Sequence, residues 1–261
     1  MSRAMRLSDK PAARAGASVL GGLALIAAAF FWLQINLKDM ILALPAFIRF
    51  FVNNFLPPNF KNTGAYIPLI LDTIFFALAG TCFSSVLAFI MGFLMSERTN
   101  GILPLRTAVR FLMSVLRNVP ILVWAALLVR IFGIGNMVGL IALILGTLGM
   151  LSRSYAESAS EISGEKIEAL RACGASYPQI LLHGIIPEFV PPWVNWTLFS
   201  FEINIRASVI LGMVGAGGIG IMVQTNIRLF KYGEALSLII ILTVMILLTE
   251  FAVNQIRKRV R

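Results

Sequence analysis

The sequence predicts an all-α membrane protein that crosses the bilayer about six times, and two features support this fold class. Of the 261 residues, 58% are hydrophobic and only 13% are charged, whereas a soluble domain carries about 25% charged residues. Long apolar stretches recur along the chain, and about 20 helical residues suffice to cross a bilayer core. These features argue against a soluble enzyme and against a disordered chain.

The first two expected spans are 15–37 and 73–96. Residues 15–37 carry no charge and follow a basic N-terminal segment. A secretory signal peptide begins in the same way, but its apolar core has only about 7–15 residues, so we expect an uncleaved first span. The second expected span is free of charge until Glu97 and Arg98 stop it.

The third expected span, 111–132, contains Arg117 and Arg130. Each arginine lies near an expected end of the span, where its long stem lets the guanidinium reach the lipid headgroups. The remaining expected spans cover 136–151, 187–212 and 235–249, the last with apolar shoulders to about residue 253.

The basic residues predict the orientation of these spans. With six spans and the N-terminus inside, the inner segments hold 15 Lys and Arg residues and the outer segments hold 7. Inner loops of membrane proteins carry this excess, so we expect a multi-pass inner-membrane protein with both termini in the cytoplasm. The net charge of +10 then reflects topology and attraction to lipid, and we expect no nucleic-acid partner.

The chain divides into three expected parts. Residues 1–65 form the N-terminal tail, the first span and an outer segment, 66–255 form the membrane core, and 256–261 form a basic tail. In the outer segment, Phe47, Phe51 and Phe55 share a helical face before Pro57 and Pro58. This stripe predicts a helix lying in the outer interface, either as a membrane anchor or as a docking site.

Metal and nucleotide chemistry have no sequence support. Cys82 and Cys173 are 91 residues apart, and His183 is the single histidine, so no disulfide framework or metal site is expected. A GxxxxGK[ST] phosphate loop is absent from the sequence, so the chain itself cannot cradle the phosphates of ATP.

The loop 153–187 predicts two short helices joined by a turn. Ser163 is placed to cap a helix over 164–173, and Gly174 to end it in a left-handed conformation. Ser176 is placed to cap a second helix, with Pro178 in its first turn, that ends at Gly184. Helices this short are marginal in water, so the pair needs a surface to fold against.

Four glutamates in this loop, Glu157, Glu161, Glu165 and Glu168, would follow one helical face if the helix were continuous. Like charges at this spacing repel, and a basic partner would relieve the repulsion. The face is either an ordinary solvated surface or a binding stripe.

The segment from Glu168 to Gly174, with Pro187 thirteen residues later, resembles the EAA loop of ABC-importer permeases of the MetI-like fold. The chain departs from the pattern at Leu170, Gly184 and Ile186. The resemblance implies a coupling helix that lies in a groove of a cytoplasmic ATPase. The residues that it implies for coupling are Glu168, Ala169, Arg171, Gly174, Ala175 and Ser176.

The segments 201–206 and 209–220 are similar to the signature of phosphonate-importer permeases of the PhnE type. Arg117 with Pro120, and Thr147, also match this subfamily. One departure is Ser200, where the subfamily usually carries an arginine. The resemblance implies a phosphonate, phosphate or phosphite as the transported ion.

Three polar residues, Glu202, Asn204 and Arg206, fall inside or at the edge of the fifth expected span. Glu202 and Arg206 are four apart, so they can form an ion pair on one helical face. That pair serves helix packing alone, or Arg206 faces the pathway and offers its N–H groups to an oxyanion, with Asn204 on the adjoining face. Both interpretations stay open.

Gly215, Gly217, Gly218 and Gly220 form a string that matches GxGxxG. The dinucleotide fingerprint requires a preceding strand, whereas this string follows a membrane span. We expect instead a tight break at the outer face, lying against the partner subunit.

Together these features predict the non-catalytic permease subunit of an ATP-driven importer for phosphonate, phosphate or phosphite. The expected partners are a second copy of the chain, two ATPase subunits that bind ATP and Mg, an extracytoplasmic binding protein and the bilayer, and we expect no cofactor in the chain itself. A permease of the same fold for methionine or betaine is the nearest alternative. A secondary transporter or channel, and a non-transporting membrane scaffold, are alternatives from other classes.

Overall fold

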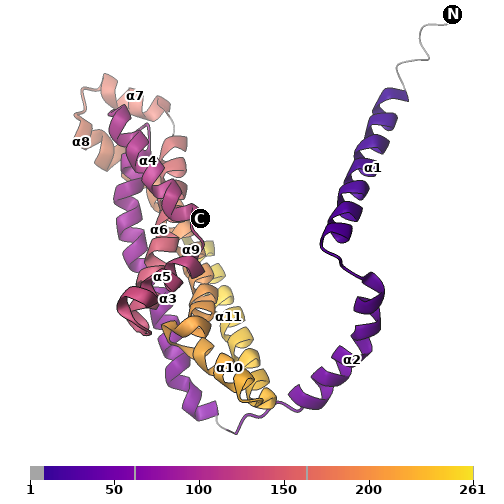
Figure 1. Cartoon of the computed structure of the whole chain (residues 1–261). Helices are drawn as coiled ribbons and strands as arrows, with labels where there is room; N and C mark the ends of the chain where they lie inside the picture. Colours follow the sequence, from indigo (N-terminus) through magenta and orange to yellow (C-terminus); the bar gives the residue numbers. More distant parts are fainter. Residues whose placement is uncertain (1–8, 62, 163, 261) are drawn as a thin grey trace, which may run out of the picture. The chain divides into compact units, whose positions relative to one another are not determined.

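The computed structural model describes residues 9–61, 63–162 and 164–260, and within these ranges the regular elements are all helices. The chain divides into two compact units, Met1–Leu56 and Pro57–Arg261 (Figure 1). The all-α fold class predicted from composition and apolar runs is therefore confirmed.

The N-terminal unit consists of α1 (Asp9–Trp32) and α2 (Leu37–Phe55), which bend by 71° at the residues between them. Asn36 caps α2, because its side-chain oxygen accepts from the Lys38 N–H at 3.2 Å. This cap starts the helix earlier than the apolar stripe suggested. The rings of Phe51 and Phe55 stack with centroids 5.0 Å apart, so the expected stripe lies on one helical face that ends before Pro57.

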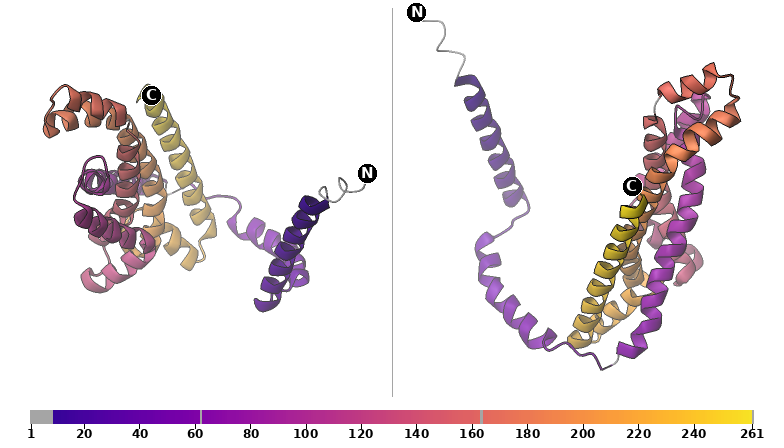
Figure 2. Two further views of the ribbon diagram at one scale, coloured as in Figure 1. Left: turned by 90° about the horizontal axis from the view of Figure 1, so that it is seen from above. Right: turned by 180° about the vertical axis from the view of Figure 1, so that it is seen from behind.

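The second unit contains the remaining helices, and α6 packs against four of them, α3, α4, α5 and α9 (Figure 2). In chain order they are α3 (Thr63–Met95), α4 (Leu103–Asn118), α5 (Ile121–Phe132), α6 (Asn136–Glu161), α7 (Gly164–Ala172), α8 (Tyr177–Ile180), the π-helical turn η1 (Leu181–Ile185), α9 (Ile186–Leu211), the π-helical turn η2 (Gly212–Ala216), α10 (Ile219–Arg228) and α11 (Tyr232–Val260).

Four helices of the described chain are long and apolar enough to cross a membrane: Thr63–Met95, Asn136–Glu161, Tyr177–Gly215 and Tyr232–Arg259. Two bent pairs, α1 with α2 and α4 with α5, raise the number to six if each pair is one span. This range agrees with the predicted count. α3 begins ten residues before its expected span, and α6 continues ten residues past its expected span through a polar segment.

The third expected span is not one helix. It forms α4 and α5, which meet at 87°. Val119 precedes Pro120 and has an extended backbone (φ −82°, ψ 119°), as proline imposes on the residue before it. Arg117 therefore lies at a break inside the pair rather than near an end of a span. This corrects the expectation that Arg117 lies near the end of a continuous span.

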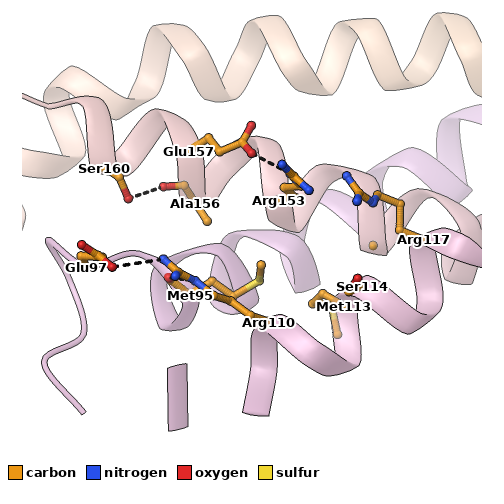
Figure 3. A pocket seen from close by; sticks show the side chains of 11 residues that line it. Met95, Glu97, Arg110, Met113, Ser114, Arg117, Arg153, Ala156, Glu157 and Ser160 are labelled. Carbon is orange, nitrogen blue, oxygen red and sulfur yellow. Dashed lines mark hydrogen bonds and ion pairs between the residues drawn. The ribbon is translucent and has the colours of Figure 1, made fainter. Parts of the chain in front are cut away.

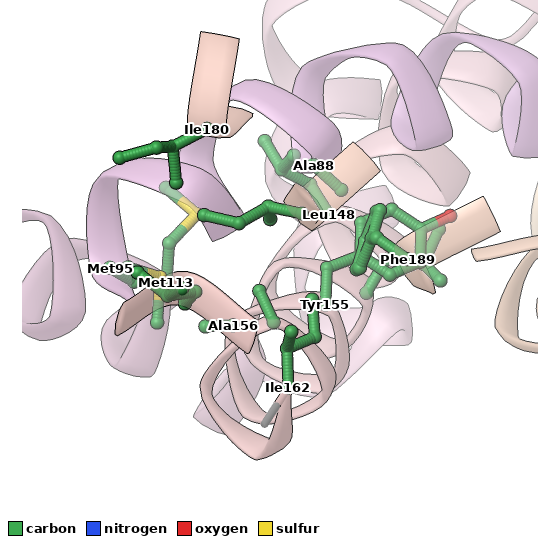
Figure 4. Packing of buried hydrophobic residues seen from close by; sticks show 13 residues of the cluster. Ala88, Met95, Met113, Leu148, Tyr155, Ala156, Ile162, Ile180 and Phe189 are labelled. Carbon is green, nitrogen blue, oxygen red and sulfur yellow. The ribbon is translucent and has the colours of Figure 1, made fainter. Parts of the chain in front are cut away.

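An apolar cluster joins α3, α4 and α6 to the short helices that follow them. Met95, Met113, Tyr155, Ile180 and Phe189 are all buried in it (Figure 4). α3 and α6 approach closely at Gly92 because glycine has no Cβ atom. A Cβ atom there would lie only 2.8 Å from the Cβ of Tyr155. Small residues of this kind allow tight helix packing in membranes. The cluster supplies the surface on which the two short helices fold.

Candidate coupling elbow and polar sites of α9

The two short helices form an elbow, defined here as residues 164–185. α7 ends as predicted at Gly174, which has a φ of +78°. The Gly174 N–H donates to the Arg171 carbonyl at 2.9 Å, and the Ala175 N–H donates to the Leu170 carbonyl at 3.1 Å. These two bonds are those of a Schellman motif, so the helix end depends on a residue that tolerates positive φ. The expected cap at Ser163 lies outside the described residues.

The second short helix begins at the expected cap. The Ser176 N–H donates to Oε1 of Gln179 at 2.8 Å, and Pro178 lies in the first turn of the helix. The missing N–H of proline costs nothing there, because first-turn N–H groups have no partner within the helix. Local chemistry therefore sets both sides of the turn.

The second short helix does not end at Gly184, in contrast to the sequence prediction. It continues through η1 into α9, so that residues 177–215 form one apolar helical segment. The Ile186 N–H bonds to the Leu181 carbonyl, which widens the turn just before Pro187. Gly184 serves close packing instead, since a Cβ there would lie 2.7 Å from Cδ1 of Leu170. The elbow and the membrane helix are thus directly connected.

The elbow packs on the chain's own helices. Ile167 and Ile180 are each only 5% exposed and belong to the apolar cluster described above. Lys166 forms an ion pair with Glu188, and the Tyr177 hydroxyl donates to the Thr99 carbonyl. Short helices that would be marginal alone are thereby held against the membrane core.

The residues implied for coupling lie on the outer surface of this elbow. Glu168, Ala169, Arg171, Gly174 and Ser176 are exposed, and Ala175 is half-buried. The apolar side of the elbow faces the chain's own helices, so the polar side is available to another subunit.

The expected acidic face does not form along one helix. α6 ends at Glu161 and α7 begins at Gly164, so Glu157 and Glu161 belong to a different helix from Glu165 and Glu168. Glu157 is moreover paired with Arg153 at 2.6 Å. Sequence spacing predicted one face only because it assumed a continuous helix.

On α9, Glu202 and Arg206 form the ion pair that their spacing permits, with an N–O distance of 2.6 Å. The second carboxylate oxygen of Glu202 lies 3.5 Å from a guanidinium nitrogen of Arg257 on α11. The Glu202 side chain is 13% exposed, whereas that of Arg206 is 45% exposed. Glu202 is thus held between two arginines, and Arg206 retains an accessible edge. Arg257 is not predicted as a partner of Glu202 by spacing, because it lies 55 residues further along the chain.

Asn204 has a different environment from Arg206. It is 2% exposed, its Nδ2 donates to the Thr81 hydroxyl at 2.9 Å, and its Oδ1 accepts from the Thr147 hydroxyl at 2.8 Å. Its amide therefore joins α9 to α3 and α6. This corrects the expectation that Asn204 lies beside Arg206 on an adjoining pathway face.

A second polar cluster between the same three helices was not anticipated from the sequence. The Tyr155 hydroxyl lies 2.6 Å from that of Thr197 and 3.0 Å from that of Ser85. Trp193 donates its indole N–H to Ser85 at 3.0 Å. Each member looks like an isolated polar residue in an apolar run, so only the packing of the helices reveals the cluster.

The glycine string breaks the helix after α9. Gly215, Gly217 and Gly218 all have positive φ, between 73° and 103°, which residues with a Cβ rarely adopt. The break packs against this chain itself: the Ile219 N–H donates to the Thr73 hydroxyl of α3 at 3.0 Å. A Cβ on Gly220 would overlap the carbonyl oxygen of Val209. Helices flank the string on both sides, unlike a dinucleotide fingerprint.

Long apolar helices, an elbow at one end and a glycine break at the other define a membrane permease of the ABC-importer class. A solved structure titled as inward-facing conformations of the MetNI methionine ABC transporter matches with a TM-score of 0.67 and 22% identity, over 75% of this chain and 96% of that one. A bacterial alginate ABC transporter matches with a TM-score of 0.64 and 15% identity, over 91% and 94% of the two chains. These likenesses show a shared fold.

Residues 84–261 match the family model described as the binding-protein-dependent transport system inner membrane component. The chain belongs to this family, and it is a multi-pass inner-membrane protein without a catalytic role of its own. The phosphite transport system permease protein PtxC of Stutzerimonas stutzeri is 31% identical over 78% of this chain and 74% of its own length. The phosphate-import permease protein PhnE of Mycolicibacterium smegmatis is 32% identical over 78% of this chain and 38% of its own length.

Proposed function

We propose that the chain is the permease subunit of an ATP-driven importer that moves phosphonate, phosphate or phosphite inward. The observation that carries this proposal is the elbow, which presents the EAA-type residues on its exposed side and continues directly into α9. The named relatives support the choice of a phosphorus oxyanion, since the similar permeases are named for phosphite and phosphate transport.

In this mechanism, a cytoplasmic ATPase subunit binds the elbow in a groove of its surface. Such a contact buries one face of a short helix, and Glu168, Arg171 and Ser176 are the exposed residues that it would engage. ATP and Mg are bound by the ATPase. Its closure displaces the elbow, and the helical connection through η1 passes the displacement to α9.

The transporter is proposed to contain two copies of this chain, two ATPase subunits and an extracytoplasmic binding protein. Both termini then face the cytoplasm, together with the elbow. In such a dimer, Arg206 appears twice around the pathway. Its accessible N–H groups suit a tetrahedral oxyanion, because a guanidinium can donate two parallel hydrogen bonds to one such group.

Reconstitution of the complex in liposomes tests this function. Wild-type transporter with its binding protein should accumulate methylphosphonate, phosphate or phosphite only when ATP is present. Arg206→Ala should reduce uptake at least tenfold, while the ATPase subunit still copurifies, because Arg206 lies away from the elbow. Arg228→Ala is the matched control, since it removes another exposed arginine from α10 and should leave uptake unchanged.

Two results would contradict the proposal. Accumulation against a gradient without ATP would indicate a secondary transporter. A binding protein that recognises methionine or betaine, but none of the three phosphorus oxyanions, would show that a permease of the same fold serves another solute.

A further inference from the structure

A cavity of about 510 Å³ lies between the end of α3, α4 and α6 (Figure 3). We call it the arginine cavity, because three guanidinium groups but only two carboxylates line it. The charged residues are Arg110, Arg117, Arg153, Glu97 and Glu157. Glu97 and Ser160 lie toward one end of the cavity in Figure 3, and Arg117 lies at the opposite end.

Two of the three arginines are already engaged. Arg153 pairs with Glu157 at 2.6 Å. Arg110 donates its Nε–H to the Met95 carbonyl at 3.0 Å and lies 3.8 Å from a Glu97 oxygen. Among the described residues, the Arg117 side chain has no hydrogen bond or ion pair. Positive charge in the cavity is therefore uncompensated at the Arg117 end.

The position of Arg117 makes this charge unusual. It lies in the last turn of α4, beside the 87° break before α5. Its backbone packs on Gly149 near the middle of α6, where a Cβ atom would lie 2.7 Å from the Arg117 nitrogen. If the bent pair is one span, Arg117 is a charged residue inside it, and such residues usually mark an ion or substrate pathway. The close α4–α6 contact holds the base of this side chain in place.

We propose that the arginine cavity is a binding site for a tetrahedral phosphorus oxyanion, with Arg117 as its main ligand. The proposal rests on the function proposed above, because the free ion in the cavity would be the transported one. The Ser114 hydroxyl also lines the cavity, one turn before Arg117. An anionic lipid headgroup presents the same phosphoryl chemistry, so the test separates the two sources.

The free ion is tested with the complete transporter in nanodiscs of phosphatidylcholine alone, titrated with radiolabelled inorganic phosphate in the absence of binding protein. Arg117→Gln should weaken binding about tenfold or more, as expected for loss of hydrogen bonds from a charged donor. Arg130→Gln, at the far end of the same bent pair and outside the cavity, should bind like wild type. Arg117→Lys keeps the charge but loses the fork of donors, so its phosphate affinity should fall between those of wild type and Arg117→Gln. This variant also tests the site if Arg117→Gln fails to assemble.

The lipid arm uses nanodiscs that also contain phosphatidylglycerol, with retained lipid counted by native mass spectrometry. If wild type binds no free phosphate but retains phosphatidylglycerol, and Arg117→Gln loses it, the site is confirmed with lipid as its occupant. Equal behaviour of wild type and Arg117→Gln in both arms overturns the proposal, as does failure of wild type to bind either probe.

Failure of this proposal is distinguishable from failure of the proposed function. If wild type imports none of methylphosphonate, phosphate and phosphite, the proposed function is wrong. The nanodisc measurement still decides whether the arginine cavity binds a phosphorus oxyanion. If wild type imports one of them and Arg117→Gln binds and imports it equally well, only the cavity assignment is wrong.

Discussion

The elbow and the polar interior of α9 are both built from a few side chains, but they differ in where the partners of those side chains lie. In the elbow, Gly174 and Ser176 bond to groups within five residues of themselves. In the interior, Asn204 bonds to Thr81 on α3 and Thr147 on α6. Local geometry therefore shapes the elbow, whereas the interior depends on the packing of three helices. Substitutions in the two regions should fail in different ways.

The largest effect is expected at the glycine break, from Gly220→Ala. The added Cβ would overlap the Val209 carbonyl oxygen, and neither backbone can move without separating α10 from α9. Overpacking of this kind costs about 1–3 kcal/mol and occasionally more. The midpoint of thermal unfolding of the purified permease should therefore fall clearly. Gly64→Ala, which meets nothing within 4 Å, is the matched control, and equal melting of both variants would contradict the packing described here.

The second largest loss of stability is expected in the polar interior, from Asn204→Ala. This change leaves the hydroxyls of Thr81 and Thr147 without their buried partner and is expected to cost about 1–3 kcal/mol. The midpoint of thermal unfolding should fall. Asn118→Ala is the control, because Asn118 is exposed and bonds within its own helix. If Asn204→Ala instead keeps its stability and selectively loses transport, Asn204 acts in the transport pathway rather than in joining the helices.

The smallest loss of stability should come from the elbow, with Gly174→Ala. A non-glycine residue in the left-handed conformation costs about 1–2 kcal/mol, and Gly174 itself is exposed, outside the buried contacts of the elbow. We expect ATP-driven uptake to fall more than the melting temperature does. Gly174→Asn should recover part of the uptake, because asparagine tolerates this conformation better. Full uptake by the alanine variant would argue against coupling through the elbow and for a scaffold role.

Sequence reasoning worked where the determinants are neighbours in the chain. The Gly174 turn, the Ser176 cap and the Glu202–Arg206 pair were all predicted from spacings of a few residues. Sequence reasoning failed at Gly184. The glycine suggested a helix end there, whereas close packing against Leu170 explains why the residue is small. It also failed at residues 111–132, because apolar composition alone gave no weight to Pro120.

Other features could not be derived from the sequence at all. Arg257 reaches Glu202 from another helix, and the cluster of Ser85, Tyr155 and Thr197 forms only when three helices meet. The sequence shows Arg117 as a charge among apolar residues, but its place beside the break depends both on Pro120, which ends α4, and on Gly149, which lets α4 and α6 approach. Such contacts join residues far apart in the chain, and a single sequence contains no signal for them.

The direct connection between the elbow and α9 has a mechanical consequence. A helical segment of 39 residues reaches roughly 58 Å, which exceeds the thickness of a bilayer core of about 30 Å. Tilting one end of such a rod swings the other end the opposite way about a pivot within the membrane. Pro191 and Pro192 lie inside this segment and remove two backbone hydrogen bonds, so they mark where the rod flexes most easily. Stiffening the helix at that point would couple the opening of the pathway at one membrane face more tightly to its closing at the other.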